Sequence, residues 1–329
     1  MDLRLDRSLA SFGDAAMELL IAPSWSGIGY AARRRLEGWD VEAPVRMDGR
    51  NVVVTGATSG IGLAAAIRFG QLGATLHLVG RDPDRTSTTA GELEGRGFHV
   101  RSSIADMGDL DAVRTIATEI AAANEHLDVL VHNAGALSSD YTISPQGFEM
   151  TIASQVLGPF LLTSLLLPQL ESGDSSGRVI TVASGGMYSE KLDVDKLVSG
   201  PDSYNGVRAY ARAKRAQVEL NVEWARRCGS KVIFQAMHPG WVDTPGVVKS
   251  LPRFHSITRP VLRSADAGAD TIVWLADVDQ QELGANGGFW LDRHRRSIAK
   301  IPGTRTTQVE RNRLWQWCED SSGSGRQPS

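Results

Sequence analysis

The chain has 329 residues, of which 42% are hydrophobic and 22% charged, and its 35 Lys plus Arg against 38 Asp plus Glu give a formal net charge of −3. The near-neutral charge argues against nucleic-acid binding as the main function, because phosphate recognition needs an excess of cations. The apolar content suffices for a packed core and excludes disorder for most of the chain. Cys228 and Cys318 lie far apart and fit no disulfide framework or C-x-x-C metal site, so we expect a cytoplasmic protein.

Residues 1–48 are predicted to form an amino-terminal helical extension. Its apolar residues recur at helical spacing ahead of Pro23, at Leu5, Leu9, Phe12, Ala16 and Leu19. Its acidic residues argue against a secretion signal, and no apolar run in the chain reaches the roughly 18 residues of a membrane-spanning helix. We expect this helix to pack on the protein's own surface. The alternative is a peripheral contact with a membrane or a partner, which the run Arg33-Arg34-Arg35 favours.

Residues 49–293 alternate short β-branched runs with longer helical patterns, which is typical of βαβ units around a parallel sheet. Helical spacing of apolar residues is clearest in 114–123 and 209–226. The sequence therefore predicts a single layered α/β domain. Its expected strands are 51–55, 75–79, 98–102, 129–133, 178–183, 231–237 and 288–291.

Residues 294–329 are predicted to form a carboxy-terminal extension. Trp315 and Trp317 lie in a segment that we expect to be a docked helix. The Ser- and Gly-rich end from Ser321 to Ser329 is predicted to be disordered.

The first predicted strand runs directly into Thr55-Gly56-Ala57-Thr58-Ser59-Gly60-Ile61-Gly62 and then into a helical pattern. Glycines let the backbone turn sharply and approach a pyrophosphate, and a helix start offers free N–H donors. Strand, turn and helix together predict a dinucleotide-binding loop, although a glycine triplet alone also fits an ordinary tight turn. The chain contains no G-x-x-x-x-G-K-[ST] sequence for a nucleoside triphosphate.

The second predicted strand ends in Val79-Gly80-Arg81-Asp82, where a dinucleotide-binding fold reads the adenosine ribose. An acid there would bind a ribose 2′-hydroxyl, whereas an arginine suits a 2′-phosphate. Gly80 takes the place of the acid and Arg81 follows it. The sequence therefore favours NADP(H), with NAD(H) as the alternative if the register slips to Asp82.

The segment Tyr210-Ala211-Arg212-Ala213-Lys214 places a phenol and an ammonium one helical turn apart. A tyrosine is a poor base at neutral pH, but a nearby Lys cation stabilises the phenolate and is expected to lower the pKa of Tyr210. The pair then predicts a general acid/base. Ser184 follows the fifth strand and Asn133 ends the fourth, at the sheet edge where doubly wound folds bind ligands.

Five motifs follow one another along the chain: Thr55-Gly-x-x-x-Gly60-Ile61-Gly62, Asn133-Ala134-Gly135, Ser184, Tyr210-x-x-x-Lys214 and Pro239-Gly240-x-x-x-Thr244. In order and approximate spacing they resemble the short-chain dehydrogenase/reductase family, over about residues 47–293. Stretches 178–187 and 238–247 are similar to the branch of dehydrogenase/reductase family member twelve, which also carries an amino-terminal extension. The resemblance implies a Rossmann-type doubly wound parallel sheet in three α/β/α layers. It also implies hydride transfer between a nicotinamide and a carbonyl or alcohol.

The resemblance further implies a role for each matched residue. Tyr210 would exchange a proton with the substrate oxygen, Lys214 would lower its pKa and hold the nicotinamide ribose, and Ser184 would hydrogen-bond the carbonyl. The implied cofactor-binding residues are Gly56, Ser59, Gly60, Ile61 and Gly62 at the pyrophosphate, Arg81 at the 2′-phosphate, Asp106 at the adenine, Asn133 with Ala134 and Gly135 at the adenosine ribose, and Pro239, Gly240 and Thr244 at the nicotinamide carboxamide.

One position departs from the family pattern. Gln155 stands just before Val156-Leu157-Gly158, where the family usually has an Asn that anchors a water relaying protons to the Lys. Gln keeps the amide but is one methylene longer, so a relay water would have to shift. Gln155 is therefore assigned to the catalytic residues, with reduced turnover and a retuned relay both left open. His132 and His238 are expected to be structural, and no metal site is predicted, since no carboxylate or thiolate is spaced to join either one.

Two long segments, 185–208 and 245–263, are expected to shape the substrate pocket at the edge of the site. Their aromatic and apolar side chains favour a lipophilic carbonyl or alcohol substrate. The alternative is that these side chains only seat the loops on the core. The side chains in question are Met187, Tyr188, Trp241 and Phe254.

A rival function is a non-catalytic dinucleotide-binding redox sensor or scaffold whose chemistry is weakened at Gln155. An extended sugar-nucleotide epimerase is disfavoured, because three residues separate Gly56 from Gly60 where that branch usually has two. Family members commonly pair through the helices that carry Gln155 and Lys214, so the resemblance leaves a homo-oligomer as an expectation.

Overall fold

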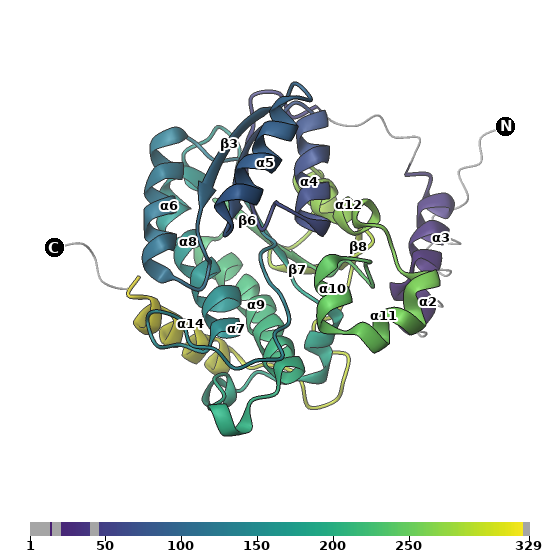
Figure 1. Cartoon of the computed structure of the whole chain (residues 1–329), viewed down its shortest axis with the longest axis vertical. Helices are drawn as coiled ribbons and strands as arrows, with labels where there is room; N and C mark the ends of the chain where they lie inside the picture. The colour runs from purple at the N-terminus through teal and green to yellow at the C-terminus, as the bar shows by residue number, and fades with distance from the viewer. Residues whose placement is uncertain (1–13, 15–20, 40–45, 325–329) are drawn as a thin grey trace.

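The computed structural model describes residue 14 and residues 21–39 and 46–324. Across these residues the chain forms an eight-stranded sheet in the order β3-β2-β1-β4-β5-β6-β7-β8 (Figure 1). Neighbouring strands pair in parallel except β7 and β8, which are antiparallel. The strands are β1 Asn51–Thr55, β2 Thr75–Gly80, β3 His99–Ile104, β4 Val129–His132, β5 Gly177–Val182, β6 Val232–Met237, β7 Gly288–Leu291 and β8 His294–Arg295.

Every strand that the sequence predicts is present, with ends that differ by two residues at most. The Rossmann-type doubly wound sheet is therefore confirmed. The sequence does not predict β8, because a two-residue strand is too short to carry an alternating pattern.

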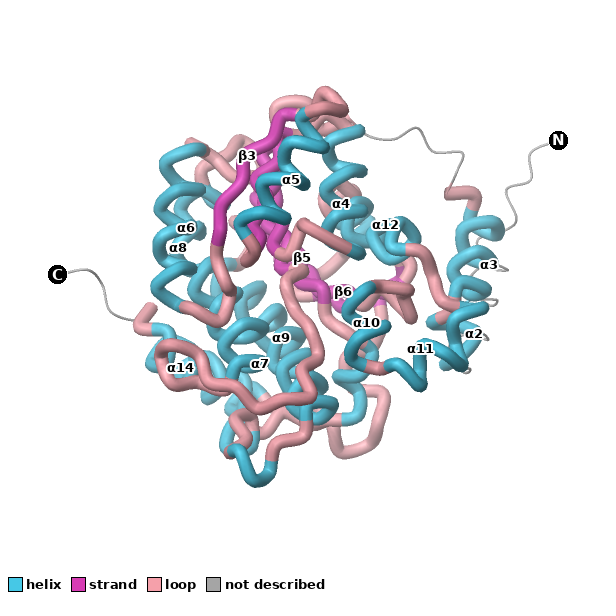
Figure 2. Tube along the Cα trace, viewed as in Figure 1, coloured by secondary structure: helices cyan, strands magenta, loops and turns pink. Residues whose placement is uncertain are grey.

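Helices cover both faces of the sheet, and Figure 2 shows the strands enclosed between them. Successive residues of a strand point to opposite faces. Thus Val53 of β1 enters one core, while Val52 and Val54 enter the other. The first core contains α6 Leu110–Ala123, α8 Gly158–Glu171, α9 Gly206–Cys228 and α14 Gln308–Ser322, and the second contains α4 Gly60–Gln71, α5 Pro83–Glu94 and α12 Ala265–Leu275.

Shorter helices lie mainly in the connections near the carboxyl ends of the strands. They are α7 Met150–Ile152, the π-helix η1 Ala153–Leu157, η2 Gly185–Ser189, η3 Val194–Lys196, η4 Pro201–Ser203, α10 Pro245–Ser250, α11 Pro252–Thr258, η5 Arg259–Val261 and α13 Gln280–Leu283.

The continuous helical segment Met150–Glu171 is the one stretch of the described residues that is long and apolar enough to cross a membrane. Its most apolar window is 72% buried inside the protein. Burial against α6, α9 and the sheet accounts for its composition as a core helix.

The amino-terminal extension contributes α2 Ile21–Trp25 and α3 Gly27–Glu37, which lie beside α11 in Figure 1. The helix predicted around residues 5–19 lies outside the described residues, apart from Asp14. Arg33 does not belong to an exposed basic face, because it is 1% exposed and pairs with Asp14 and Asp292 at 2.7 Å each. Only Arg34 and Arg35 of the predicted basic run are exposed.

The carboxy-terminal extension docks through α14, as its tryptophans predict. Trp315 packs edge-on against Trp224 of α9 and Phe160 of α8, at ring-centroid distances of 4.5 and 4.9 Å. The predicted disorder from Ser321 is wrong for the first residues of that range. Ser322 ends α14, and its hydroxyl donates a hydrogen bond to the carbonyl of Cys318. Residues 325–329 lie outside the described residues.

Candidate active site

The glycine loop joins the carboxyl end of β1 to the first turn of α4. Gly56 and Gly60 adopt φ values of 66° and 54°, in the left-handed region that favours glycine. A Cβ at Gly62 would lie only 2.4 Å from the carbonyl oxygen of Gly56. Ser59 occupies the N-cap of α4 without a side-chain cap hydrogen bond, which leaves the first N–H donors of the helix to a ligand. Ile61 follows within the first turn of α4. The predicted pyrophosphate-binding residues therefore all lie at the carboxyl edge of the sheet, next to the end of β1.

Asn133 fastens this loop to the end of β4. Its amide nitrogen donates to the carbonyls of Thr55 and Gly56, at 3.0 and 3.2 Å. The N–H of Ala134 donates to the Thr55 hydroxyl at 3.1 Å. The Asn133 side chain is thus committed to the loop, so a contact with a ribose would fall to the main chain of this turn.

The end of β2 leaves room for Arg81 but not for an acid at the preceding position. A Cβ at Gly80 would lie 2.1 Å from the Thr86 hydroxyl oxygen. The Asp82 carboxylate caps α5, because it accepts the N–H of Arg85 at 2.9 Å. Arg81 is exposed. Asp82 is thus engaged at the start of α5, while the placement of Arg81 at the ribose stays a prediction.

Asp106 lies in the turn after β3 and is half-buried. Its Oδ1 accepts the N–H of Gly108 at 2.8 Å. This bond orients the carboxylate at the same sheet edge as the glycine loop.

Ser184, Tyr210 and Lys214 are brought together where α9 crosses the carboxyl end of β5. The Nζ of Lys214 lies 5.4 Å from the centre of the Tyr210 ring. It donates a hydrogen bond of 2.9 Å to the carbonyl of Val182, two residues before Ser184. The Ser184 hydroxyl accepts the N–H of Gly186 at 3.2 Å. The chain thus presents a hydroxyl, a phenol and an amine at one point of the sheet edge.

Burial dominates the ionisation of this group. It raises the pKa of Tyr210 above its usual value, while the Ser184 side chain acts in the opposite direction. It also lowers the pKa of Lys214 to about 7. Burial is thus the largest influence on the pKa of Tyr210 in this structure, and the lowering of this pKa by Lys214 stays a prediction. Tyr210 is therefore a protonated phenol at neutral pH.

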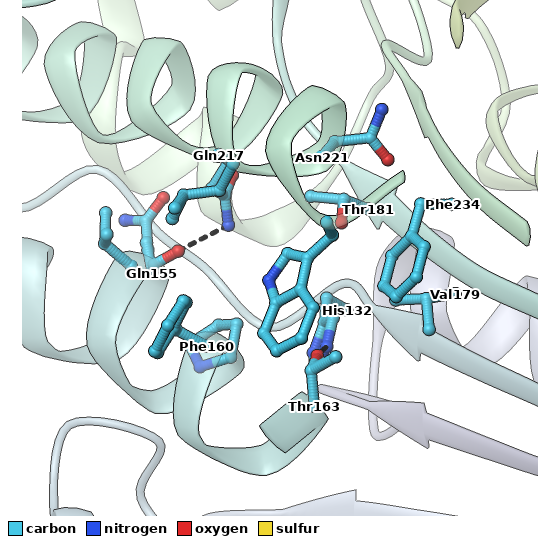
Figure 3. A pocket seen from close by; sticks show the side chains of 13 residues that line it. His132, Gln155, Phe160, Thr163, Val179, Thr181, Gln217, Asn221 and Phe234 are labelled. Atoms are coloured by element: carbon cyan, nitrogen blue, oxygen red, sulfur yellow. Dashed lines mark hydrogen bonds between the residues drawn. The ribbon is translucent and has the colours of Figure 1, made fainter. Parts of the chain in front are cut away.

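Gln155 lies in the π-helix η1 and is 1% exposed. Its Nε2 donates a hydrogen bond to the carbonyl of Ala136 at 2.8 Å. Its main-chain carbonyl accepts a hydrogen bond from the Gln217 Nε2 at 2.6 Å (Figure 3). A Cβ at Gly135 would lie 3.0 Å from the Gln155 Oε1 and 3.3 Å from the Lys214 Nζ. The amide oxygen of Gln155 and the amine of Lys214 thus face the same glycine.

A buried cavity of about 30 Å³ lies behind Gln155, between β4, β5, α8 and α9 (Figure 3). Several of the residues that line it carry a buried polar atom without a hydrogen-bond partner among the described residues: His132 Nδ1, Gln155 Oε1, Gln217 Oε1 and Asn221 Oδ1. A cavity of this size and polarity can hold about two water molecules.

His132 and His238 have structural surroundings, in line with the prediction. His132 shares a hydrogen bond of 2.7 Å with the Thr163 hydroxyl, and burial lowers its pKa to about 3. Burial also lowers the pKa of His238 well below its usual range. Both rings are neutral at physiological pH, and the described residues contain no cluster of His, Cys, Asp and Glu that could hold a metal ion.

The turn after β6 carries Pro239, Gly240 and Thr244. Gly240 has a φ of 75°, and a Cβ there would lie 2.5 Å from the Arg263 guanidinium. The Thr244 hydroxyl caps α10 by accepting the N–H of Val247 at 3.3 Å. The Thr244 methyl group would lie 3.3 Å from a Cβ at Gly60, so this turn faces the glycine loop across the site.

The two loops expected to shape the substrate pocket differ in their packing. Met187 and Tyr188 are 0% and 6% exposed and belong to the core, so they seat the first loop. Trp241 and Phe254 are half-buried and meet edge-on at a centroid distance of 5.3 Å. An apolar wall is thus present on the side of α11.

Comparison with known proteins assigns the family. A model described as short chain dehydrogenase matches residues 50–253, which is more than half of the chain. The chain belongs to the short-chain dehydrogenase/reductase family. Dehydrogenase/reductase SDR family member 12 of Bos taurus is 38% identical over 266 residues, which are 80% of this chain and 82% of that protein. The predicted similarity to this branch is confirmed.

Other members of the family extend the comparison. Human retinol dehydrogenase 13 is 31% identical over 269 residues, which are 81% of this chain and 78% of that protein. A Beutenbergia cavernae protein solved with bound NADP has 26% identity and a TM-score of 0.62, over 75% of this chain and 96% of that one. As a short-chain dehydrogenase/reductase, the protein is an oxidoreductase of a family that uses a nicotinamide cofactor.

Sequence reasoning misses two residues that support this short-chain dehydrogenase/reductase site. Gln217, on the Lys214 helix, binds the main chain of Gln155, but nothing in its spacing indicates a partner 62 positions away. Trp25 packs against Gly185 beside Ser184 although the two are 160 positions apart in sequence (185 − 25 = 160). The only sequence signal is glycine itself at position 185, which indicates a close approach without naming what approaches.

Proposed function

We propose that this protein is an NADP(H)-dependent oxidoreductase that reduces a lipophilic carbonyl compound, with Tyr210 as the general acid. The observation that carries the proposal is the convergence of Ser184, Tyr210 and Lys214 at the sheet edge faced by the glycine loop. The cofactor, when bound, supplies the hydride for the carbonyl carbon. The cradle of Gly56, Gly60 and Gly62 fits it, because Gly56 and Gly60 have left-handed φ values and a Cβ at Gly56 or Gly62 would collide with the Asn133-Ala134 turn, so the bare backbone can approach a pyrophosphate.

The chain's own groups handle the proton. The Ser184 hydroxyl hydrogen-bonds the substrate carbonyl, and the Tyr210 phenol donates its proton to that oxygen. Burial raises the pKa of this phenol, so it is protonated at neutral pH and can act as the acid in carbonyl reduction. The Lys214 ammonium, 5.4 Å from the ring, stabilises the phenolate that this transfer leaves.

Gln155 fits a role in returning the proton to Tyr210. Its Oε1 and the Lys214 Nζ face the same glycine, so a water between them could bind both. The main-chain carbonyl of Gln155 already accepts a hydrogen bond from Gln217. The Oε1 of Gln155 is therefore the acceptor that can bind the relay water. This supports a retuned relay over a weakened one.

Arg81 is expected to select NADP(H). Replacing it with Asp removes charge-assisted hydrogen bonds to the 2′-phosphate and should weaken NADPH binding about 10- to 100-fold, with a shift of preference toward NADH. Calorimetric titration of both nucleotides measures this. Arg85→Asp, an equally exposed arginine one turn along, is the control and should leave the preference unchanged. Unchanged NADPH affinity in Arg81→Asp would place the ribose elsewhere.

Lys214 is expected to make the reaction pH-dependent. Because burial lowers its pKa to about 7, the ammonium is lost as the pH rises through that value. We therefore expect kcat/KM for NADPH, which reports the free enzyme, to fall above about pH 7. Lys214→Arg keeps the charge and should remove this inflection. A profile for the wild-type protein that stays flat from pH 6 to 9 would count against the assignment.

The direct test of the proposed function is NADPH oxidation with a panel of lipophilic aldehydes and ketones. The apolar wall of Trp241 and Phe254 supports this substrate class. We expect turnover of at least one bulky apolar carbonyl compound. Tight NADPH binding without turnover across the panel would favour the rival function, a non-catalytic redox sensor.

A further inference from the structure

Trp25, the last residue of α2, lies against the turn that follows β6. Its carbonyl oxygen accepts hydrogen bonds from the Trp241 N–H at 2.7 Å and from the Arg263 Nε at 2.9 Å. Its ring lies 4.8 Å from the His238 ring, centroid to centroid, at an angle of 66°. Trp25 therefore contacts the residues on both sides of Pro239-Gly240.

The same indole covers the turn that follows β5. A Cβ at Gly185 would lie 2.3 Å from the Cη2 and Cζ3 atoms of Trp25, so only glycine fits beneath the ring. The ring also stacks with Tyr188 at a centroid distance of 6.2 Å. Because the Ser184 hydroxyl accepts the N–H of Gly186, its orientation depends on the turn that Trp25 covers.

A buried ion cluster holds the segment that carries Trp25. The guanidinium groups of Arg33 and Arg263 both donate to the carbonyl of Ser24, each at 2.9 Å. Both also pair with Asp292 in the turn between β7 and β8. Arg33, Arg263 and Asp292 are at most 2% exposed. Separating buried charges of this kind costs free energy, because each charge would be left buried without its partner. The cluster therefore fixes Trp25 relative to the sheet.

We propose that Trp25 is a positioning residue: a wedge from the amino-terminal extension that sets the Ser184 turn and the Pro239-Gly240 turn relative to each other. The inference rests on the proposed function, in which the first turn orients the carbonyl and the second borders the nicotinamide. Reacting groups that shift by about 1 Å can lose about 100-fold in rate. The extension is then part of the active-site architecture through Trp25, which acts on the two turns.

The test compares Trp25→Ala, Trp25→Phe and Trp39→Ala in the full chain. Trp39 is the matched control, since it is a half-buried tryptophan of the same extension that packs on Tyr30 and Arg293 instead. We expect Trp25→Ala to lower kcat for carbonyl reduction at least about tenfold with the NADPH Kd within a few-fold, and Trp25→Phe to restore most of it. Trp39→Ala should keep kcat. A merely structural role would lower the melting temperature of both alanine variants without separating their kcat values, and equal kcat values would overturn the proposal.

Hydrogen exchange of the cofactor-free proteins tests Trp25 independently of any activity. The reporters are the amides of Gly186 and Trp241, one in each turn. We expect both to exchange faster in Trp25→Ala than in Trp39→Ala. Equal exchange at both sites contradicts the proposal. If the wild-type chain neither binds NADPH nor reduces a carbonyl, the proposed function fails, and the exchange data still decide whether Trp25 fixes the two turns.

Discussion

Replacing Tyr210 with phenylalanine is expected to abolish carbonyl reduction while NADPH binding stays within a few-fold of the wild-type affinity. The substitution removes only the hydroxyl that donates the proton, and general acid catalysis contributes about 10²- to 10⁴-fold to a rate. The glycine loop and Arg81, which would bind the nucleotide, are untouched. Steady-state NADPH oxidation measures the rate of carbonyl reduction, and calorimetry measures the NADPH affinity.

Tyr204→Phe is the control for this prediction. Tyr204 precedes the same helix, and its hydroxyl donates to the Ser138 carbonyl at 3.1 Å. The Tyr204→Phe substitution should therefore lower turnover far less than Tyr210→Phe does. If Tyr210→Phe instead keeps comparable activity, Tyr210 is not the proton donor, and another group must supply the proton.

Replacing Asp292 with asparagine is expected to be the most destabilising single change in the extension contact. Asparagine tolerates the left-handed backbone at this position, where φ is 52°, so the change isolates the lost charge. It leaves the Arg33 and Arg263 guanidinium groups buried with one carboxylate fewer. Breaking a buried pair in this way costs about 3 to 5 kcal/mol of the free energy of unfolding. The urea midpoint, followed by tryptophan fluorescence, measures it.

Asp195→Asn supplies the comparison for the stability measurement. Asp195 also pairs with an arginine, Arg313 of α14, but both side chains are more than half exposed. Solvent-exposed pairs contribute little, so this variant should unfold at the wild-type midpoint. Equal midpoints for the Asp292 and Asp195 variants would mean that the buried cluster does not anchor the extension.

Sequence patterns predict the fold well because each strand carries its own local signal. In β1, three valines in succession already indicate a strand buried on both faces, and both cores use them. The glycine loop and the Tyr210-Lys214 pair are predictable for the same reason, since strand, turn and helix lie next to one another in the chain.

The contacts that fix the amino-terminal extension have no such local signal. Arg33 meets Asp292 across 259 positions, and a run of three arginines resembles an exposed basic face. The direction of the Tyr210 pKa is likewise not predictable from the sequence, because spacing places Lys214 one turn away but does not show the burial that raises this pKa. The placement of the extension and the pKa of Tyr210 therefore depend on long-range packing and desolvation, which local motifs do not show.

The proposed oxidoreductase function is tested most directly by a calorimetric titration of the full chain with NADPH and, separately, with NADH. We expect binding of both nucleotides with a clear preference for NADPH, since Gly80 leaves no space for an acidic side chain and the exposed Arg81 offers a cation beside it. Binding of neither nucleotide would contradict an oxidoreductase function for this member of the family.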